Sequence, residues 1–262
     1  MYSETIEKFV EMAVKKADLL AKKPLSFFLG SVAAGAYVGL GILLIFSVGA
    51  ALPAPVQKLA MGATFAVALI LVVIAGAELF TGYTMYMTLG IFARRVNGQA
   101  LLRTWVVSWV GNLAGSALVA ALFAVGGANG LLSNPASLVY SVADYKMSGS
   151  VAALFARAIL CNWLVCLALW MAHRVQGDAA KCIVIFWCLL AFIASGYEHS
   201  VANMTLLSLA VIGRAGDLPT LMAAFYNLSV VTAGNVVGGA VMMAGLYWIA
   251  DGRRLIGQEN QT

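Results

Sequence analysis

Two long apolar runs of this chain are each interrupted by a short polar stretch, GAELFTG at residues 76–82 and GYEHSVAN at residues 196–203. These stretches carry Glu78 and Glu198, the two acidic side chains inside the apolar segments. Backbone that leaves its helix at membrane depth needs hydrogen-bond partners in the protein or in a wet cavity. Two such interruptions, one in each half of the chain, predict a substrate pathway near the middle of a bilayer.

The composition of the chain is that of an integral membrane protein. Of its 262 residues, 62% are hydrophobic and only 10% are charged. A water-soluble domain cannot expose so apolar a surface. The first residues are charged and amphipathic and lack a short apolar core, so we expect no cleavable signal peptide. The net charge of +5 is spread over the flanks of the apolar segments, which indicates orientation and not nucleic-acid binding.

Six segments are long and apolar enough to cross a bilayer as helices, which requires about 20 residues each. They cover residues 25–52, 59–92, 105–125, 151–172, 182–212 and 221–250. The second and the fifth are too long for one straight helix and contain the polar stretches, so we predict that both are broken. The predicted fold is therefore an all-α membrane protein with six transmembrane helices, one domain over residues 1–262 with its core at 25–250.

Lys and Arg residues are distributed unequally between the two sides that this topology defines. Twelve flank the spans on the side of the termini, whereas the other side has Lys58, Lys146 and Arg214, and Arg157 lies within a span. The positive-inside rule then places both termini, with the tail at 251–262, in the cytoplasm. We interpret the amphipathic residues 1–24 as a helix on the cytoplasmic leaflet. A helix that covers the cytoplasmic mouth of a pathway is the alternative.

The two halves of the chain share a second pattern. The motif Gly-Asn-x-x-Gly follows the polar stretch in each half, at residues 111–115 and 234–238. Because each half has three spans, the second half enters the membrane the other way up, which predicts an inverted repeat. The glycines are typical of close helix packing. The amides of Asn112 and Asn235 need partners in an apolar setting, and we expect them to bind the open backbone at the breaks.

Three motifs resemble the formate/nitrite transporter family, and within it the bacterial nitrite channel branch most. They are ELFTG at residues 78–82, ILCNWLVCLA at 159–168 and GYEHSVANM at 196–204. The resemblance implies a homopentamer of aquaporin-like protomers in a bacterial inner membrane, each with its own pore for small monovalent anions. It also implies that Lys146 lies near the pore.

The resemblance further implies a polar chamber between two hydrophobic constrictions of the pore. The chamber would hold Thr81, Asn162 and His199. The cytoplasmic constriction would consist of Leu69, Leu79, Phe80 and Val165, and the periplasmic one of Phe65 and Phe192.

Several residue types have competing interpretations. His199 could be an ordinary core histidine, but an ionisable group on a helix break is typical of a pathway. Thr81 could be a helix cap, although its place in the opposite half favours the pore lining. Glu78 and Glu198 could be a catalytic pair, but a carboxylate beside a helix N-terminus accepts N–H groups and offsets the dipole. We therefore assign them to structural support at the breaks, together with Asn112, Asn203 and Asn235.

We expect a channel or transporter for nitrite, with a proton coupled to the anion at His199, whose ordinary pKa is about 6.5. Formate or hydrosulfide is the alternative substrate, and a water- or glycerol-type channel for neutral solutes is the alternative class. An intramembrane enzyme lacks a nucleophile or metal cluster near His199, so we expect no enzyme. We expect no cofactor and no metal site, because the four cysteines are not at ligand spacing.

Overall fold

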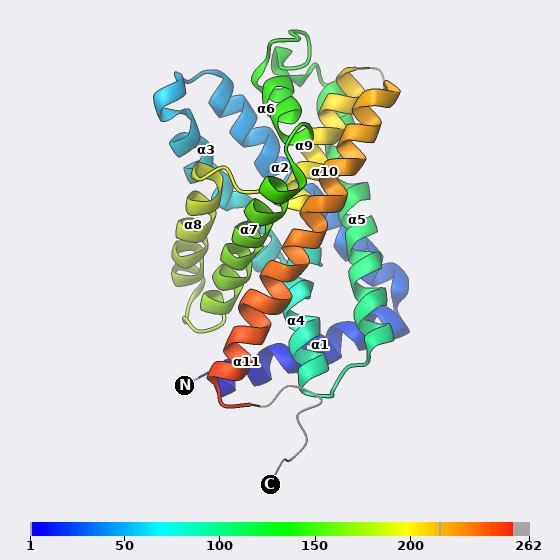
Figure 1. Cartoon of the computed structure of the whole chain (residues 1–262), viewed down its shortest axis with the longest axis vertical. Helices are drawn as coiled ribbons and strands as arrows, with labels where there is room; N and C mark the ends of the chain where they lie inside the picture. The colour runs from blue at the N-terminus through cyan, green and yellow to red at the C-terminus, as the bar shows by residue number, and fades with distance from the viewer. Residues whose placement is uncertain (1, 215, 254–262) are drawn as a thin grey trace.

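The computed structural model describes residues 2–214 and 216–253, so most of the predicted tail at 251–262 lies outside the described residues (Figure 1). Within this part the chain is all-helical, without strands. Five stretches in it are long and apolar enough to cross a membrane as helices. They are Pro24–Ala50, Ala54–Gly76, Gly98–Val125, Val151–Ala172 and Leu218–Ala250.

The long helices surround two short ones. The outer set comprises α2 (Pro24–Ala50), α3 (Ala54–Ile70) with its π-helical end η1 (Leu71–Gly76), α5 (Gly98–Val125), α7 (Val151–Ala172), α8 (Asp178–Ala194) and α10 (Leu218–Val237), which continues through η3 (Gly238–Gly245) into α11 (Leu246–Ala250). The inner pair is α4 (Phe80–Phe92) and α9 (Ser200–Gly213). Residues 80–90 of α4 and 200–207 of α9 are buried on all sides, as expected for helices that are apolar all round.

The inner helices occupy opposite halves of the bundle. In Figure 1, α4 lies in the lower half and α9 in the upper half, and both begin near the middle. Their first turns are in contact there, since Thr81 of α4 and His199 at the start of α9 are hydrogen-bonded at 3.1 Å. Two helix N-termini, the positive ends of the helix dipoles, are thus directed toward the centre of the molecule.

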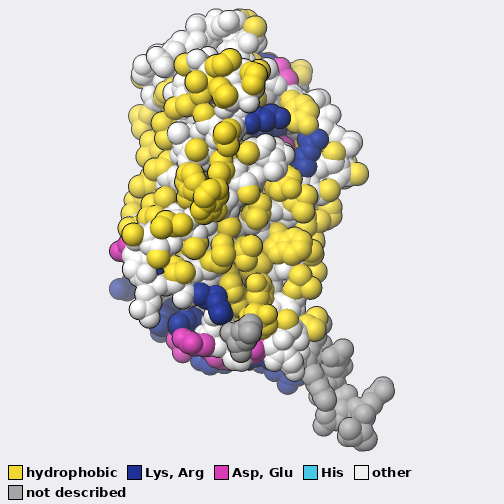
Figure 2. Space-filling view, turned by 90° about the vertical axis from the view of Figure 1, so that its left-hand side faces the viewer, with side chains coloured by type: hydrophobic (Ala, Val, Ile, Leu, Met, Phe, Trp, Pro, Cys, Tyr) yellow, Lys and Arg dark blue, Asp and Glu magenta, His cyan; other side chains and the backbone are white. Residues whose placement is uncertain are grey.

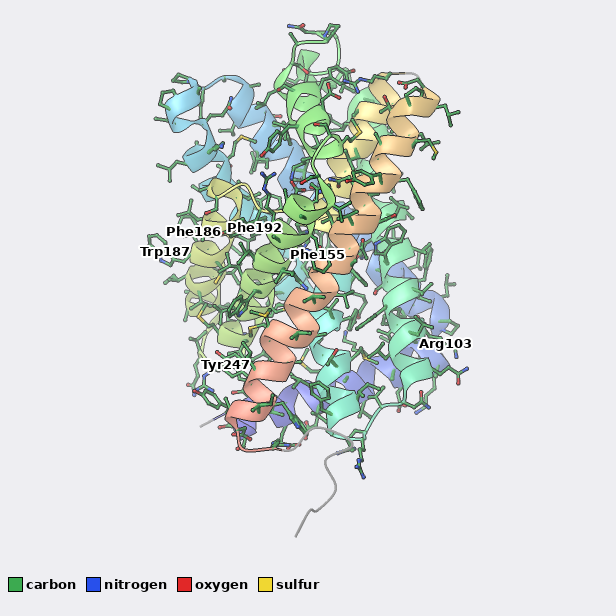
Figure 3. The ribbon with its side chains drawn as sticks, viewed as in Figure 1. Arg103, Phe155, Phe186, Trp187, Phe192 and Tyr247 are labelled. Carbon is green, nitrogen blue, oxygen red and sulfur yellow. The ribbon has the colours of Figure 1, made fainter. Side chains whose placement is uncertain are left out.

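The outer surface of the bundle is apolar along its height. Figure 2 shows hydrophobic side chains over most of one face, with Lys and Arg gathered at the lower end and in a smaller group near the upper end. Trp187 points outward from α8 in Figure 3 and is 63% exposed. So large an exposed apolar surface marks a protein that lies in lipid or against other chains. The chain is therefore a multi-pass membrane protein.

The helix α1 (Ser3–Lys22) closes one end of the bundle, which we call the α1 end. Its stripe Ile6, Phe9, Val10 and Ala13 is fully buried in protein, where α1 packs against α4. An ion pair joins Arg253 to Glu7, so the two ends of the described chain meet at this end of the bundle.

The opposite end, which we call the α6 end, carries a helix that the sequence analysis did not predict. The connection between α5 and α7 contains the short 3-10 helix η2 (Ala128–Gly130) and the helix α6 (Leu138–Met147). Val139, Ala143 and Met147 of α6 are buried and four residues apart, so they form one apolar face against the bundle.

Candidate functional site

The site lies where the two inner helices begin. Residues 77–79 separate η1 from α4, and residues 195–199 separate α8 from α9. Gly76 and Gly196 adopt φ angles of 81° and 71°, which favour glycine because it has no Cβ. After each glycine the chain has three residues, with a glutamate in the middle, before the inner helix starts. That last residue is Leu79 in the first half and His199 in the second.

Asn112 of α5 holds the backbone of the first non-helical segment. Its Oδ1 accepts the N–H of Phe80 at 2.9 Å, which is an orphan donor at the start of α4. Its Nδ2 donates to the carbonyls of Glu78 at 3.0 Å and Ser31 at 2.8 Å. The N–H of Glu78 donates to the carbonyl of Gly30 in α2 at 3.1 Å.

Asn235 of α10 repeats this arrangement in the second half. Its Oδ1 accepts the N–H of Ser200 at 2.8 Å. Its Nδ2 donates to the carbonyls of Glu198 at 2.9 Å and Ala158 at 2.8 Å. The N–H of Glu198 donates to the carbonyl of Arg157 at 3.4 Å. The two segments are therefore held by matching sets of hydrogen bonds.

The two glutamates bind side chains. The carboxylate of Glu78 accepts the ammonium of Lys16 at 2.6 Å and the hydroxyl of Tyr83. The carboxylate of Glu198 accepts the ammonium of Lys146 at 2.8 Å and the Nδ2 of Asn203 at 2.6 Å. The N–H groups at the starts of α4 and α9 bind the asparagine amides instead, which differs from our expectation for the carboxylates. Lys16 and Tyr83 were not anticipated from the sequence.

His199 has a defined hydrogen-bonding role on each ring nitrogen. Its Nδ1 accepts the N–H of Ala202 at 3.1 Å and so caps α9. A nitrogen that accepts carries no proton, so the ring in this geometry is neutral and its proton is on Nε2. Nε2 lies 3.1 Å from Thr81 Oγ1 and can donate to it. The ring is buried and stacks against Phe192, with the centroids 6.0 Å apart.

Asn162 of α7 joins the two halves of the structure. Its Nδ2 lies 3.3 Å from the carbonyl of Thr81, 2.8 Å from Thr84 Oγ1 and 2.6 Å from the carbonyl of Asn235. The residue is fully buried. Its donors are therefore used by the protein itself, and the hydroxyl of Thr81 and the ring of His199 remain the polar groups nearest the centre.

Two large cavities approach this centre from opposite ends. The cavity at the α1 end has a volume of about 640 Å³ and extends to Glu78 and Leu79. The cavity at the α6 end has a volume of about 480 Å³ and extends to Phe192 and Glu198. Lys16 lines the first and Lys146 the second, so an ammonium group stands in each.

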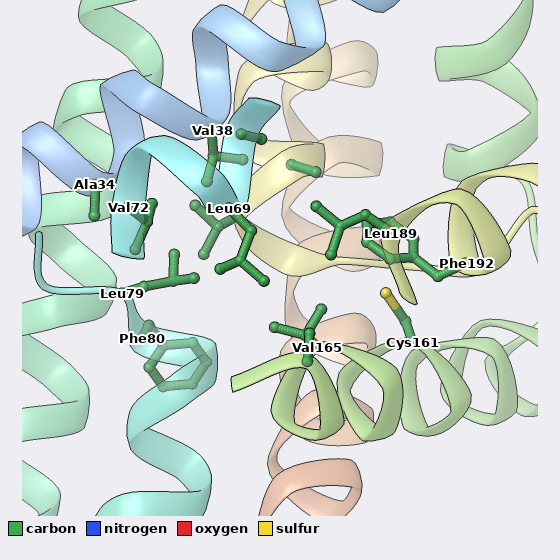
Figure 4. Close-up of a cluster of buried hydrophobic side chains, with 14 of the residues drawn as sticks. Ala34, Val38, Leu69, Val72, Leu79, Phe80, Cys161, Val165, Leu189 and Phe192 are labelled. Carbon is green, nitrogen blue, oxygen red and sulfur yellow. The ribbon is translucent and has the colours of Figure 1, made fainter. Parts of the chain in front are cut away.

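A third, very small cavity of about 10 Å³ lies between them. It shares Leu79 with the cavity at the α1 end and Phe192 with the cavity at the α6 end. Its lining consists of Val38, Phe65, Ala68, Leu69, Leu79, Val165, Leu189, Phe192 and His199, most of which appear in Figure 4. Such a space holds one water molecule at most. The passage is thus closed and apolar, with the imidazole as the one polar side chain among these lining residues.

The structure places the predicted constriction residues in this narrow cavity, with one exception. Phe65, Leu69, Leu79, Val165 and Phe192, which were predicted to form two separate constrictions, line this one cavity together with His199, whereas Thr81 and Asn162 do not line it. Phe80 is buried beside the cavity without lining it.

Comparison with known proteins agrees with the resemblance noted from the sequence. The Formate/nitrite transporter family model matches residues 3–249. The Nitrite transporter NirC of Escherichia coli (strain K12) is 50% identical over 250 residues, covering 95% of this chain and 92% of that protein.

Two solved structures have the same fold. One, described as an FNT family ion channel, is 50% identical with a TM-score of 0.91 and covers 95% of this chain and 99% of its own. The other, described as a pentameric formate channel with formate bound, is 26% identical with a TM-score of 0.71, covering 87% and 97%.

Proposed function

This chain belongs to the formate/nitrite transporter family, and we propose that it conducts nitrite and related small monovalent anions across a membrane, with a proton coupled to the anion at His199. One observation carries this proposal: two large cavities with cationic side chains approach each other and are separated by a small apolar cavity that His199 lines. Formate is a second candidate substrate, because a structural relative is described with formate bound and both anions are bent, with two terminal oxygens.

The proposed arrangement in the membrane has six spans. The stretches that end at Gly76 and Ala194 and continue as α4 and α9 would be the broken second and fifth helices. The matching bonds of Asn112 and Asn235 support an inverted repeat. Basic residues concentrated at the α1 end support cytoplasmic termini in a bacterial inner membrane. The relative described as pentameric supports a homopentamer with one pathway in each protomer.

The apolar lining of the narrow cavity makes the passage of an anion costly in free energy. Taking a small anion from water into a medium of dielectric near 4 costs on the order of 20 kcal/mol by an idealised estimate. Protonating the anion costs about 1.4 kcal/mol for each unit by which its pKa lies below the ambient pH, so about 5 kcal/mol for a gap of about four units. Passage as the neutral acid is therefore the cheaper route through the narrow cavity.

The proposed roles of the residues follow the route of the anion from the two large cavities to the narrow cavity at the centre. The N-terminal ends of α4 and α9 raise the local concentration of anions, while the ammonium groups of Lys16 and Lys146, each paired with a glutamate, line the two cavities. Nε2 of His199 and the hydroxyl of Thr81 hydrogen-bond the anion at the point where it takes up its proton. The apolar lining then favours the neutral acid over the ion.

The hydrogen bonds of His199 restrict how this proton is delivered. For Nε2 to release a proton to the anion, Nδ1 has to acquire one, and this breaks its bond with the N–H of Ala202. Proton transfer from the ring is thus coupled to loss of the α9 cap, at a cost of about 1 kcal/mol for a typical cap. Low pH supplies that proton, so we expect faster uptake as the external pH falls.

The test is electrical recording and flux measurement on purified protein in liposomes, with nitrite and formate compared over a range of pH. We expect electroneutral, pH-dependent flux from the native chain. His199→Phe should abolish the pH dependence, and Thr81→Ala should lower flux less than His199→Phe does. Proton-coupled nitrite uptake that survives in His199→Phe would refute the transfer step. A loss in Thr81→Ala as large as that in His199→Phe would refute the ranking of the two residues.

A further inference from the structure

The cavity at the α6 end contains a charge that the proposed mechanism has not used. Three cations line it, Lys58, Lys146 and Arg157, against the single carboxylate of Glu198. Lys146 is neutralised by Glu198 at 2.8 Å, and its side chain is only 15% exposed. Lys58 is exposed. Arg157 is half-buried on α7, at the level where its carbonyl accepts the N–H of Glu198.

The guanidinium of Arg157 is held without being neutralised. It lies over the ring of Tyr145, with Cζ 5.2 Å from the centroid. Within residues 2–214 and 216–253 it forms no ion pair and donates no hydrogen bond. A cation–π contact orients a guanidinium and leaves its N–H fork unused. Arg157 is therefore a positive charge with five free donors in the wall of a cavity on the substrate route.

Among the described residues that line the cavity at the α1 end, there is no equivalent group. Its three lysines are all paired, Lys8 with Glu4, Lys16 with Glu78 and Lys181 with Asp178. The residue that occupies the place of Arg157 in the first half, judged by the bond from the glutamate N–H, is Gly30. Among the described residues, an unpaired guanidinium therefore lines the cavity at the α6 end and not the cavity at the α1 end.

We propose that Arg157 docks planar anions with two terminal oxygens, such as nitrite and formate, and selects them over single-atom or single-centre anions such as hydrosulfide and chloride. This inference rests on the proposed function and deepens it. A guanidinium binds two oxygens of a planar anion through parallel N–H bonds, which an ammonium cannot do. The ring of Tyr145 that contacts the guanidinium lines the same cavity, as do Lys146 and Glu198, and Glu198 directly precedes His199 in the chain.

The experiment compares Arg157→Lys with a matched control in liposomes containing the full chain. Arg214→Lys is the control, because Arg214 also lies over a tyrosine ring, that of Tyr140 at 5.0 Å, but is paired with Asp144 and lies outside the cavity lining. We expect Arg157→Lys to raise the apparent KM for nitrite and formate about tenfold, the loss of one hydrogen bond to a charged group. Hydrosulfide flux, which uses charge alone, should stay within about twofold. Arg214→Lys should match the native chain for all three anions.

Equal slowing of nitrite and hydrosulfide in Arg157→Lys would overturn the proposal and make Arg157 a structural partner of Glu198. Unchanged nitrite kinetics would overturn it as well. A second measurement does not depend on transport. Phenylglyoxal modifies accessible arginines, and mass spectrometry locates the adducts in the detergent-solubilised native protein. Nitrite or formate should slow modification of Arg157 and leave Arg214 unaffected, and chloride at equal concentration should protect neither.

Protection of Arg157 by chloride equal to that by nitrite would refute the selectivity. If the native chain carries none of the anions, the proposed function fails, and the labelling result still decides whether Arg157 binds them.

Discussion

Removal of the Asn112 side chain is the sharpest test of how the non-helical segments are held. Asn112→Ala deletes one acceptor and two donor bonds, at 2.9, 2.8 and 3.0 Å, from a residue that is fully buried. The backbone groups of Ser31, Glu78 and Phe80 lose these partners, and water has little access to them.

The size of the loss can be bracketed. Three bonds at the average for membrane proteins, about 0.6 kcal/mol each, amount to about 2 kcal/mol. Three unpaired buried groups at about 1 to 3 kcal/mol each amount to about 3 to 9 kcal/mol. We expect a loss near about 4 kcal/mol, because complete burial favours the upper estimate while partial relaxation of the backbone lowers it. Asn235→Ala should cost the same within about 1 kcal/mol, since its three bonds match.

The assay is the free energy of unfolding in mixed micelles, titrated with a denaturing detergent and followed by tryptophan fluorescence. Asn97→Ala is the control, because Asn97 is an exposed cap of α5 with one bond, to the N–H of Ala100 at 2.8 Å. It should lose about 1 kcal/mol. An Asn112→Ala protein no less stable than Asn97→Ala would refute the account of the breaks. So would a large difference between Asn112→Ala and Asn235→Ala.

Three further outcomes follow from the structure. Lys146→Met should lower the free energy of unfolding by about 3 to 5 kcal/mol in the same assay, because Glu198 is left buried with its charge uncompensated. Glu198→Gln should lower it less, and equal losses in the two variants would contradict this reasoning. Gly115→Ala should lower the thermal midpoint in detergent, because the new methyl overlaps a carbonyl of α2, and Gly98→Ala, which meets open space, should not. Burial lowers the pKa of His173, at the end of α7, from its ordinary 6.5, so the unfolded chain binds that proton more readily than the folded chain. The contribution of His173 to the free energy of unfolding should be complete above pH 6.5 and decrease as the pH falls below it. The free energy of unfolding of His173→Phe should therefore decrease less between about pH 7 and pH 5 than that of the native chain.

The parts of the fold that the sequence predicted are those in which local chemistry leaves few options. Glu78 and Glu198 each stand two residues after a glycine inside an apolar run, and both lie in non-helical segments of the structure, at residues 77–79 and 195–199. A buried amide has to find backbone partners, so the bonds of Asn112 and Asn235 were predictable in kind. The family was predictable as well, because its motifs are long and lie in order along the chain.

The parts that were not predicted depend on contacts between distant segments. Lys16 reaches Glu78 across 62 positions, and no periodicity in the sequence indicates that partner. The helix α6 was not predicted, because its ten residues form only one short apolar face. The tautomer of His199 follows from a bond to the N–H of Ala202, which only coordinates reveal. Arg157 was counted as a charge within a span, since the ring of Tyr145 that orients it lies on the unpredicted helix.

The bonds of Asn162 have a consequence for the kinetics of conduction. One amide fastens α7 to α4 and to α10, and so clamps together elements from both halves of the molecule. A protein that worked by rocking one half against the other would have to break this clamp in every cycle. If these bonds persist, we expect the narrow cavity to open by rotation of a few lining side chains within a fixed frame. The rate of conduction should therefore depend only weakly on temperature, as it does in a pore.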